Sequence, residues 1–215
     1  MTQSVGKTCF WVAMILWATA PGLAHAQHDW WKCRGGTDSR PKERKASADQ
    51  ERRLSDFGLG IFSPELPGYG AEFTTFSRTD LTRRFGPPLS TESTERRPRD
   101  TTEPVEILTN WQYRGFKIVT VASKSNPDAL TVERGEAFDA KVPLRHGVRV
   151  GQPIDLWVRQ FGRPGCRNGH LVYRGERRFA CGRDKASTCV STYRIELFLD
   201  GAGRVRLIAW DHPVL

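Results

Sequence analysis

The sequence predicts an α+β fold built from two copies of one unit, a helix followed by an antiparallel β-meander, with the two sheets side by side and the helices covering one face. Three observations lead to this prediction. Two short amphipathic segments each end in Phe-Gly-x-Pro, and each is followed by segments rich in β-branched and aromatic residues. Blocks of similar sequence also recur in the same order along the chain.

The first unit is expected over residues 73–146. Ser77 can cap a short helix, which ends at Gly86 because the prolines after it cannot continue a helix. The polar stretch that follows, residues 90–104, is predicted to be a mobile loop because it offers no apolar anchor. Three strands are expected next, with a tight turn at Arg114 and Gly115 between the first two; they cover residues 105–113, 116–123 and 130–138.

The second unit is expected over residues 147–215. Its helix should begin near Pro153, which suits a first helical turn, and end at Phe161 before Gly162. Residues 200–203, Asp-Gly-Ala-Gly, are typical of a turn between the last two strands. The expected strands cover residues 169–174, 176–181, 190–199 and 204–210.

Two sequence matches favour a duplication. Residues 80–88 of the first helix and its stop correspond to residues 155–164, with one extra residue in the second copy. The tripeptide Tyr-Arg-Gly at residues 113–115 recurs at residues 173–175. This second match predicts a hairpin turn in each half.

These residues resemble a known family. The helix that ends in Phe161, Gly162 and Pro164, the segment 148–151 before it and the hairpin sequence 193–201 after it look like the small periplasmic module of BamE (SmpA/OmlA type) proteins. Two such modules in tandem are similar to the architecture of β-lactamase inhibitory proteins. The resemblance implies a non-enzymatic protein that binds other proteins through its sheet face or loops. Family members are lipid-anchored single modules, whereas this chain lacks a lipidation cysteine and has a basic arm.

The first 26 residues are predicted to be a cleaved signal peptide. Lys7 precedes an apolar run at residues 9–20, and Ala24 and Ala26 form an Ala-x-Ala site, so Gln27 should be the mature N-terminus. About 12 apolar residues are too few to cross a bilayer, which needs about 20, and the protein is not expected to span the membrane. Periplasmic or secreted localisation follows. Residues 27–72 should form a basic polar arm and connector, with a short helix at residues 48–57.

The charge of the chain narrows the set of expected partners. The formal net charge of +9 comes mostly from dispersed arginines, which suits a soluble basic surface, and export makes nucleic acid an unexpected partner. Anionic envelope lipids such as lipopolysaccharide remain possible ligands.

Four cysteines remain after cleavage, and an even number in an exported chain predicts two disulfides rather than a metal site. We expect Cys181 with Cys189 and Cys33 with Cys166, with Cys166 to Cys181 as the alternative.

No motif for catalysis or cofactor binding is present. Asp211 and His212 are adjacent on an expected strand, so their side chains should point to opposite faces and cannot orient each other as a catalytic pair. Neither a catalytic residue nor a cofactor is therefore predicted.

Alternation along the last two strands predicts a binding surface instead. Apolar residues at 193, 195, 197 and 199 should meet the helices, so their neighbours should form an open face with aromatic residues among arginines. An arm that folds back over these side chains is the competing explanation. The predicted surface consists of Arg194, Glu196, Phe198, Arg204, Arg206 and Trp210.

The favoured function is a protein-binding module of the bacterial envelope, acting in assembly or as an inhibitor, with another exported or outer-membrane protein as its partner. The alternatives are a basic protein that binds polyanions or lipopolysaccharide, and an unrecognised periplasmic hydrolase.

Overall fold

The computed structural model describes residues 46–60, 75–97, 104–181 and 187–211, all within the unit Trp31–Leu215. The described helices are α1 (Ala48–Leu59), α2 (Arg78–Phe85), the 3-10 helix η1 (Arg145–Gly147) and α3 (Ile154–Phe161). The strands are β1 (Ser90–Arg96), β2 (Glu106–Tyr113), β3 (Phe116–Ser123), β4 (Asn126–Ala137), β5 (Gly165–Arg167), β6 (His170–Cys181), β7 (Ser187–Leu199) and β8 (Val205–Asp211).

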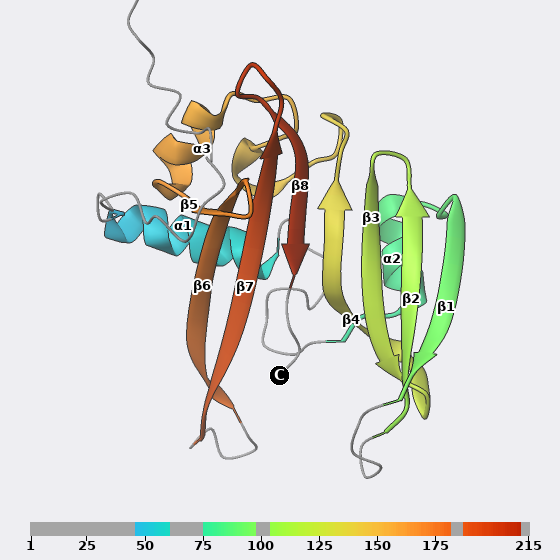
Figure 1. Cartoon of the computed structure of the whole chain (residues 1–215). Coiled ribbons are helices and arrows are strands. Elements are labelled where there is room, and N and C mark those ends of the chain that lie inside the picture. Colours follow the sequence, from blue (N-terminus) through green and yellow to red (C-terminus); the bar gives the residue numbers. More distant parts are fainter. Residues whose placement is uncertain (1–45, 61–74, 98–103, 182–186, 212–215) are drawn as a thin grey trace, which may run out of the picture. The chain divides into compact units, whose positions relative to one another are not determined.

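All eight strands belong to one sheet with the order β1-β2-β3-β4-β8-β7-β6-β5 (Figure 1). Each neighbouring pair is antiparallel. The join is short: β4 and β8 share the register pairs from Arg134 with Asp211 to Ala137 with Ile208. A helix precedes four strands in each half of this order, α2 before β1 to β4 and α3 before β5 to β8.

The predicted fold class, α+β with two tandem units and two side-by-side sheets, is wrong. The described chain is mostly β and forms one continuous sheet. An unpaired strand edge leaves a row of backbone donors and acceptors without partners, and pairing β4 with β8 satisfies those groups at the join. The pattern of single segments carries no information about such a pairing between strands that lie about 70 residues apart in the sequence.

The expected boundaries of α2 and α3 and the start of α1 are confirmed, whereas α1 ends at Leu59, two residues later than expected. Ser47 and Ser77 each accept a hydrogen bond from a backbone amide three residues on, at Gln50 and Asp80, and those residues bond back in capping boxes. α2 ends at Gly86 with φ 76°, and α3 ends at Gly162 with φ 79°. Both φ values lie in the left-handed region that glycine adopts without strain, and this explains the repeated Phe-Gly stop signal.

The expected loop at residues 90–104 is wrong in its first half, because residues 90–96 form the edge strand β1. Its residues are exposed, except for the half-buried Arg96, so hydrophobic alternation could not reveal it. Backbone pairing with β2, from Ser90 with Gln112 to Arg96 with Glu106, holds the strand in place. Ion pairs add support, since Arg96 contacts Glu106 at 2.6 Å and Glu133 at 3.1 Å.

The expected hairpin at Arg114 and Gly115 is confirmed, because Tyr113 pairs with Phe116 across it. The matching hairpin at residues 173–175 is wrong, since these residues lie inside the continuous strand β6. Gly175 is required there by packing: a Cβ atom at this position would lie 2.1 Å from the hydroxyl oxygen of Tyr193 on β7. The tripeptide Tyr-Arg-Gly therefore forms a hairpin turn at residues 113–115, whereas at residues 173–175 it lies within a strand and its glycine packs against an aromatic ring.

The helices pack against one face of the sheet (Figure 1). The Phe85 ring of α2 lies 5.6 Å from Tyr113 and 4.9 Å from Phe116. The Phe161 ring of α3 lies 6.1 Å from Tyr173. Because successive side chains of a strand point to opposite faces, the neighbours of these aromatic residues lie on the other side. We call that side the open face.

Helix α1 is part of this packing, although it falls in the segment predicted to be a basic arm. Its Phe57 is fully buried, with ring contacts to Trp157 at 5.7 Å and Phe161 at 5.2 Å on α3. Arg145 donates hydrogen bonds to the backbone and side-chain oxygens of Asp56, at 2.9 and 2.7 Å. The Phe57 ring, the contact of Arg145 with Asp56 and hydrogen bonds from Gln50 to the Val158 and Arg159 carbonyl oxygens thus attach a helix whose sequence is mostly polar. The predicted signal peptide and residues 27–45 lie outside the described residues.

Candidate functional site

The predicted alternation along β7 is confirmed from Tyr193 to Leu197, whereas Leu199, the last residue of the predicted apolar row, is only half-buried. Tyr193, Ile195 and Leu197 are 5%, 0% and 0% exposed. Arg194, Glu196 and Phe198, which alternate with them, are half-buried on the open face. Three of the six predicted surface residues therefore lie on the open face of this strand.

The predicted position of Trp210 is wrong. Trp210 is 3% exposed, and Ile208, two residues before it on β8, is 0% exposed. Trp210 pairs with the buried Ile195, and Ile208 pairs with the buried Leu197, so both lie on the helix side. The register between β7 and β8 shifts between Phe198 and Leu199. Such an irregularity changes the phase of alternation, which a strict period of two along β8 does not anticipate.

The remaining two predicted residues lie elsewhere. Arg204 is exposed beside the turn before β8 and donates a hydrogen bond to the carbonyl oxygen of Gly151 at 3.0 Å. Arg206 is exposed and lines neither of the two cavities described below. The structure therefore does not bring the six predicted residues together in one cluster.

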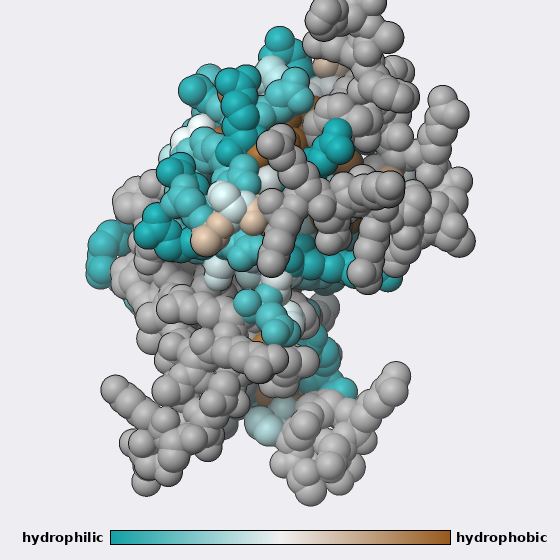
Figure 2. Space-filling model, turned by 90° about the vertical axis from the view of Figure 1, so that its left-hand side faces the viewer, coloured by the Kyte–Doolittle hydropathy of each residue, from teal (hydrophilic) through white to brown (hydrophobic). Residues whose placement is uncertain are grey.

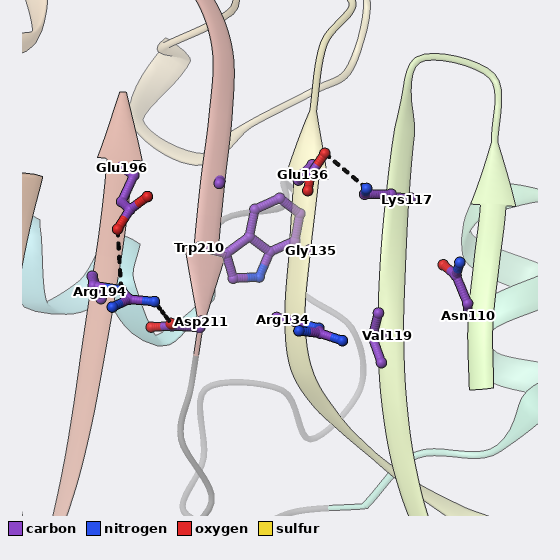
Figure 3. A pocket seen from close by; sticks show the side chains of 11 residues that line it. Asn110, Lys117, Val119, Arg134, Gly135, Glu136, Arg194, Glu196, Trp210 and Asp211 are labelled. Atoms are coloured by element: carbon purple, nitrogen blue, oxygen red, sulfur yellow. Dashed lines mark hydrogen bonds and ion pairs between the residues drawn. The ribbon is translucent and has the colours of Figure 1, made fainter. Parts of the chain in front are cut away.

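The Trp210 ring lies against Gly135 where β4 meets β8 (Figure 3). A Cβ atom on Gly135 would lie 2.2 Å from Cζ2 of Trp210 and 2.7 Å from the carbonyl oxygen of Lys117. Only glycine leaves room for both groups. Trp210 and Gly135 are among the residues that line a cavity of about 380 Å³, whose other lining residues include charged side chains of the open face.

A second cavity, of about 510 Å³, adjoins the first across β6 and β7. The two share Arg194 and Asp211 as lining residues. We call the joined cavities the transverse groove, because it crosses the strands rather than following one of them. Its central row is formed by residues that stand opposite one another in successive strands from β2 to β6: Asn110, Val119, Arg134, Asp211, Arg194 and Arg174.

Ion pairs inside the groove hold two of its cations in place. Arg194 contacts Asp211, and its Nε lies 3.4 Å from Glu196. The Nζ of Lys117 lies 3.0 Å from Glu136 (Figure 3). These side chains are between about a quarter and two-fifths exposed, so each pair contributes modestly to stability, about 1 kcal/mol or less.

Three other groove arginines are exposed and make no ion pair within the described part of the chain. Arg134 lines the first cavity, whereas Arg167 and Arg174 line the second. None of them was singled out from the sequence, although Arg134 and Arg174 occupy open-face positions of their strands. Alternation could have placed each arginine on that face. Nothing in the sequence indicates that β4 and β8 pair, and this pairing brings Arg134 into one row with Arg174.

Exposed apolar side chains are few in the ranges that the structure describes. Leu89 at 68% and Phe138 at 44% are the large exposed hydrophobic residues among those described. Figure 2 shows the side that lies at the left of Figure 1, where the described surface is mostly hydrophilic. A polar, charged recess is therefore the most prominent candidate site in the described regions.

The groove shows no catalytic arrangement. Asp211 is bound by Arg194, and His212 lies outside the described residues. The His170 ring lies against Phe198, tilted by 42° with ring centroids 4.2 Å apart, and the Nε2 of His146 lies 2.9 Å from a carboxylate oxygen of Asp56 on α1. Over the ranges that the structure describes, no group of three or more His, Cys, Asp or Glu side chains could hold a metal ion.

The cysteines are separated by the strand register. Cys166 is disulfide-bonded and stands opposite Leu171, whereas Cys181 ends β6 ten positions further on. At roughly 3.3 Å per residue this amounts to about 33 Å along the strand, so the alternative pairing of Cys166 with Cys181 is excluded. Cys33 lies outside the described residues, and its pairing with Cys166 stays a prediction.

The bridge between Cys181 and Cys189 also stays a prediction. Cys181 stands opposite Ser187, and Cys189 stands opposite Phe179, so the two cysteines are diagonal rather than directly facing. Diagonal positions are about 7–8 Å apart at Cα, which is at or beyond the upper limit for a disulfide. A bond here requires a local adjustment of the strand ends.

Comparison of the chain with protein-family models, with curated proteins and with solved structures found no match. None of the helices in the described ranges is long and apolar enough to cross a bilayer.

Proposed function

We propose that this chain is an exported, non-enzymatic binding protein of the bacterial envelope, and that it holds a partner protein on the open face across the transverse groove. The observation that carries the proposal is the groove itself. It lies on the side of the sheet away from the helices, and its floor is organised by ion pairs before any ligand arrives. Preorganised side chains lose little conformational freedom on binding, which favours affinity.

Export rests on the signal sequence at residues 1–26 and on the expected mature N-terminus at Gln27. The resemblance to BamE-type modules supports a protein rather than a small molecule as the ligand. The wide, polar groove also suits a protein segment. Small-molecule sites are mostly apolar, whereas protein interfaces carry a polar rim and many hydrogen bonds.

The test uses a bulky substitution that fills the groove. Ala209 is half-buried and lines the first cavity, so Ala209→Trp should block a partner without disturbing the helix side. Arg159→Trp is the matched control, because Arg159 is exposed on α3. The mature protein, crosslinked in envelope extract, should lose its captured partner in Ala209→Trp and keep it in Arg159→Trp. Retention of the same partner by both variants would rule out the groove as the interface.

A basic protein that binds polyanions is the second candidate, and it is favoured by the three groove arginines that make no ion pair with any residue the structure describes. Salt separates the two candidates, because binding that depends on many phosphate or sulfate contacts weakens steeply with ionic strength. A partner protein held by several kinds of contact should remain bound at moderate salt.

A further inference from the structure

We propose that the transverse groove recognises an extended acidic segment of its partner, with two carboxylates spaced four residues apart. This inference rests on the proposed function and names the chemistry of the ligand. Its starting point is that some cations of the groove face a carboxylate and others do not. Arg194 and Lys117 already face carboxylates, whereas Arg134 and Arg174 are exposed and make no ion pair in the regions described.

The strand register gives the spacing. Arg134 stands opposite Asp211, Asp211 opposite Arg194, and Arg194 opposite Arg174. Arg134 and Arg174 are therefore three strand spacings apart, about 14 Å at roughly 4.8 Å each. An extended chain rises about 3.4 Å per residue, so four residues cover nearly the same distance. Residues separated by four also point to the same side of an extended segment.

The same row explains why the ligand should be acidic only at its two contact points. Between Arg134 and Arg174 the groove presents Asp211 and Glu196 beside Arg194. A carboxylate placed over this centre would meet like charge, whereas a neutral polar residue would not. A chain with an anion at every position is disfavoured for the same reason, and a protein segment therefore suits the row better than a uniform polyanion.

Arginine is well suited to this recognition. Its planar guanidinium forms paired hydrogen bonds with a carboxylate, and such charge-assisted bonds are stronger than neutral ones. Arg167 also lines the second cavity but stands opposite His170, off the row that contains Arg174, so the row itself presents two exposed arginines to the segment. The groove then selects a segment by the positions of its charges as well as by their sign.

Fluorescence anisotropy of the mature protein with a labelled synthetic peptide tests the proposal. The probe peptide is Thr-Val-Asp-Thr-Val-Thr-Asp-Val-Thr, and the control peptide has Asn in place of both aspartates. At low salt we expect the Asp peptide to bind about tenfold more tightly than the Asn peptide. Arg134→Gln and Arg174→Gln should each weaken the Asp peptide about threefold to fivefold, and the double variant should bind both peptides equally.

Arg206→Gln is the matched control, because Arg206 is an exposed arginine outside both cavities. It should leave the affinity for the Asp peptide unchanged. Equal affinity for the two peptides, including no binding of either, overturns the proposal, as does an equal effect of Arg206→Gln and Arg134→Gln. Tighter binding of inorganic polyphosphate, weakened by the same two groove substitutions, would assign the site to polyanions instead.

This outcome is separable from the proposed function. If Ala209→Trp releases the captured partner while Arg134→Gln and Arg174→Gln do not weaken the Asp peptide, the groove is an interface but its ligand is not an acidic segment. If Ala209→Trp leaves partner capture intact while the arginine variants weaken the Asp peptide, the groove binds carboxylates but is not the interface that holds the partner.

Discussion

Replacing Trp210 with alanine tests whether this side chain belongs to the core or to a binding surface. Trp210 is 3% exposed and lies over Gly135. Burial of about 200 Å² of an aromatic side chain, at about 25 cal/mol per Å², amounts to about 5 kcal/mol. That value is an upper bound because the unfolded chain is partly compact. The expected loss of unfolding free energy for Trp210→Ala is therefore about 3–5 kcal/mol.

The assay is urea unfolding followed by far-ultraviolet circular dichroism, with Phe198→Ala as the comparison. Phe198 is half-buried on the open face, so its substitution should cost clearly less, about 1 kcal/mol. A loss below 1 kcal/mol for Trp210→Ala, together with loss of partner binding, would refute the core assignment. It would restore Trp210 as a surface contact.

A double-mutant cycle with Gly135→Ala sharpens the test. The new methyl group would meet the Trp210 ring at 2.2 Å, so the substitution should destabilise the protein strongly on its own. In the Trp210→Ala background that clash is gone, and the cost should fall by about 1–3 kcal/mol. Trp210→Ala should relieve only part of the destabilisation caused by Gly135→Ala, because the Lys117 carbonyl oxygen still lies 2.7 Å from the methyl position. Additive effects would show that the ring does not cover Gly135.

Three further predictions concern the core and the cysteines. Phe57→Ala should lower the unfolding free energy by about 3–5 kcal/mol, because Phe57 is fully buried against α3; a loss under 1 kcal/mol in urea unfolding would show that α1 is not docked. Burial raises the pKa of both Tyr113 and Tyr193 from 10 to about 12. Their contribution to the unfolding free energy is complete below pH 10 and is lost as pH rises through about 12. Tyr113→Phe should therefore reduce the fall in stability between pH 10 and 12. A stability that does not change across this range would contradict the burial of the two phenols. Non-reducing peptide mapping should recover Cys166 joined to Cys33, and a Cys166 peptide joined to Cys181 would contradict the β6 register.

Sequence reasoning about the site succeeded on one strand and failed on the next. Along β7 the apolar row ending in Leu197 is regular, so alternation placed Arg194 and Glu196 on the open face as the structure has them. Along β8 the register shift moved Trp210 to the helix side. A period-two pattern holds only while pairing is regular, and an irregularity depends on the neighbouring strand.

The sequence by itself determined both ends of α2, the end of α3 and the first hairpin, because a serine cap, a glycine with positive φ and a proline act on the backbone within a few residues. Only the tertiary structure decided that β4 pairs with β8, that the polar segment β1 is a strand, and that Phe57 anchors α1. These outcomes depend on backbone hydrogen bonds and packing between segments far apart in the chain. The groove arises at that long-range join, so its charged row becomes visible only when the whole sheet is assembled.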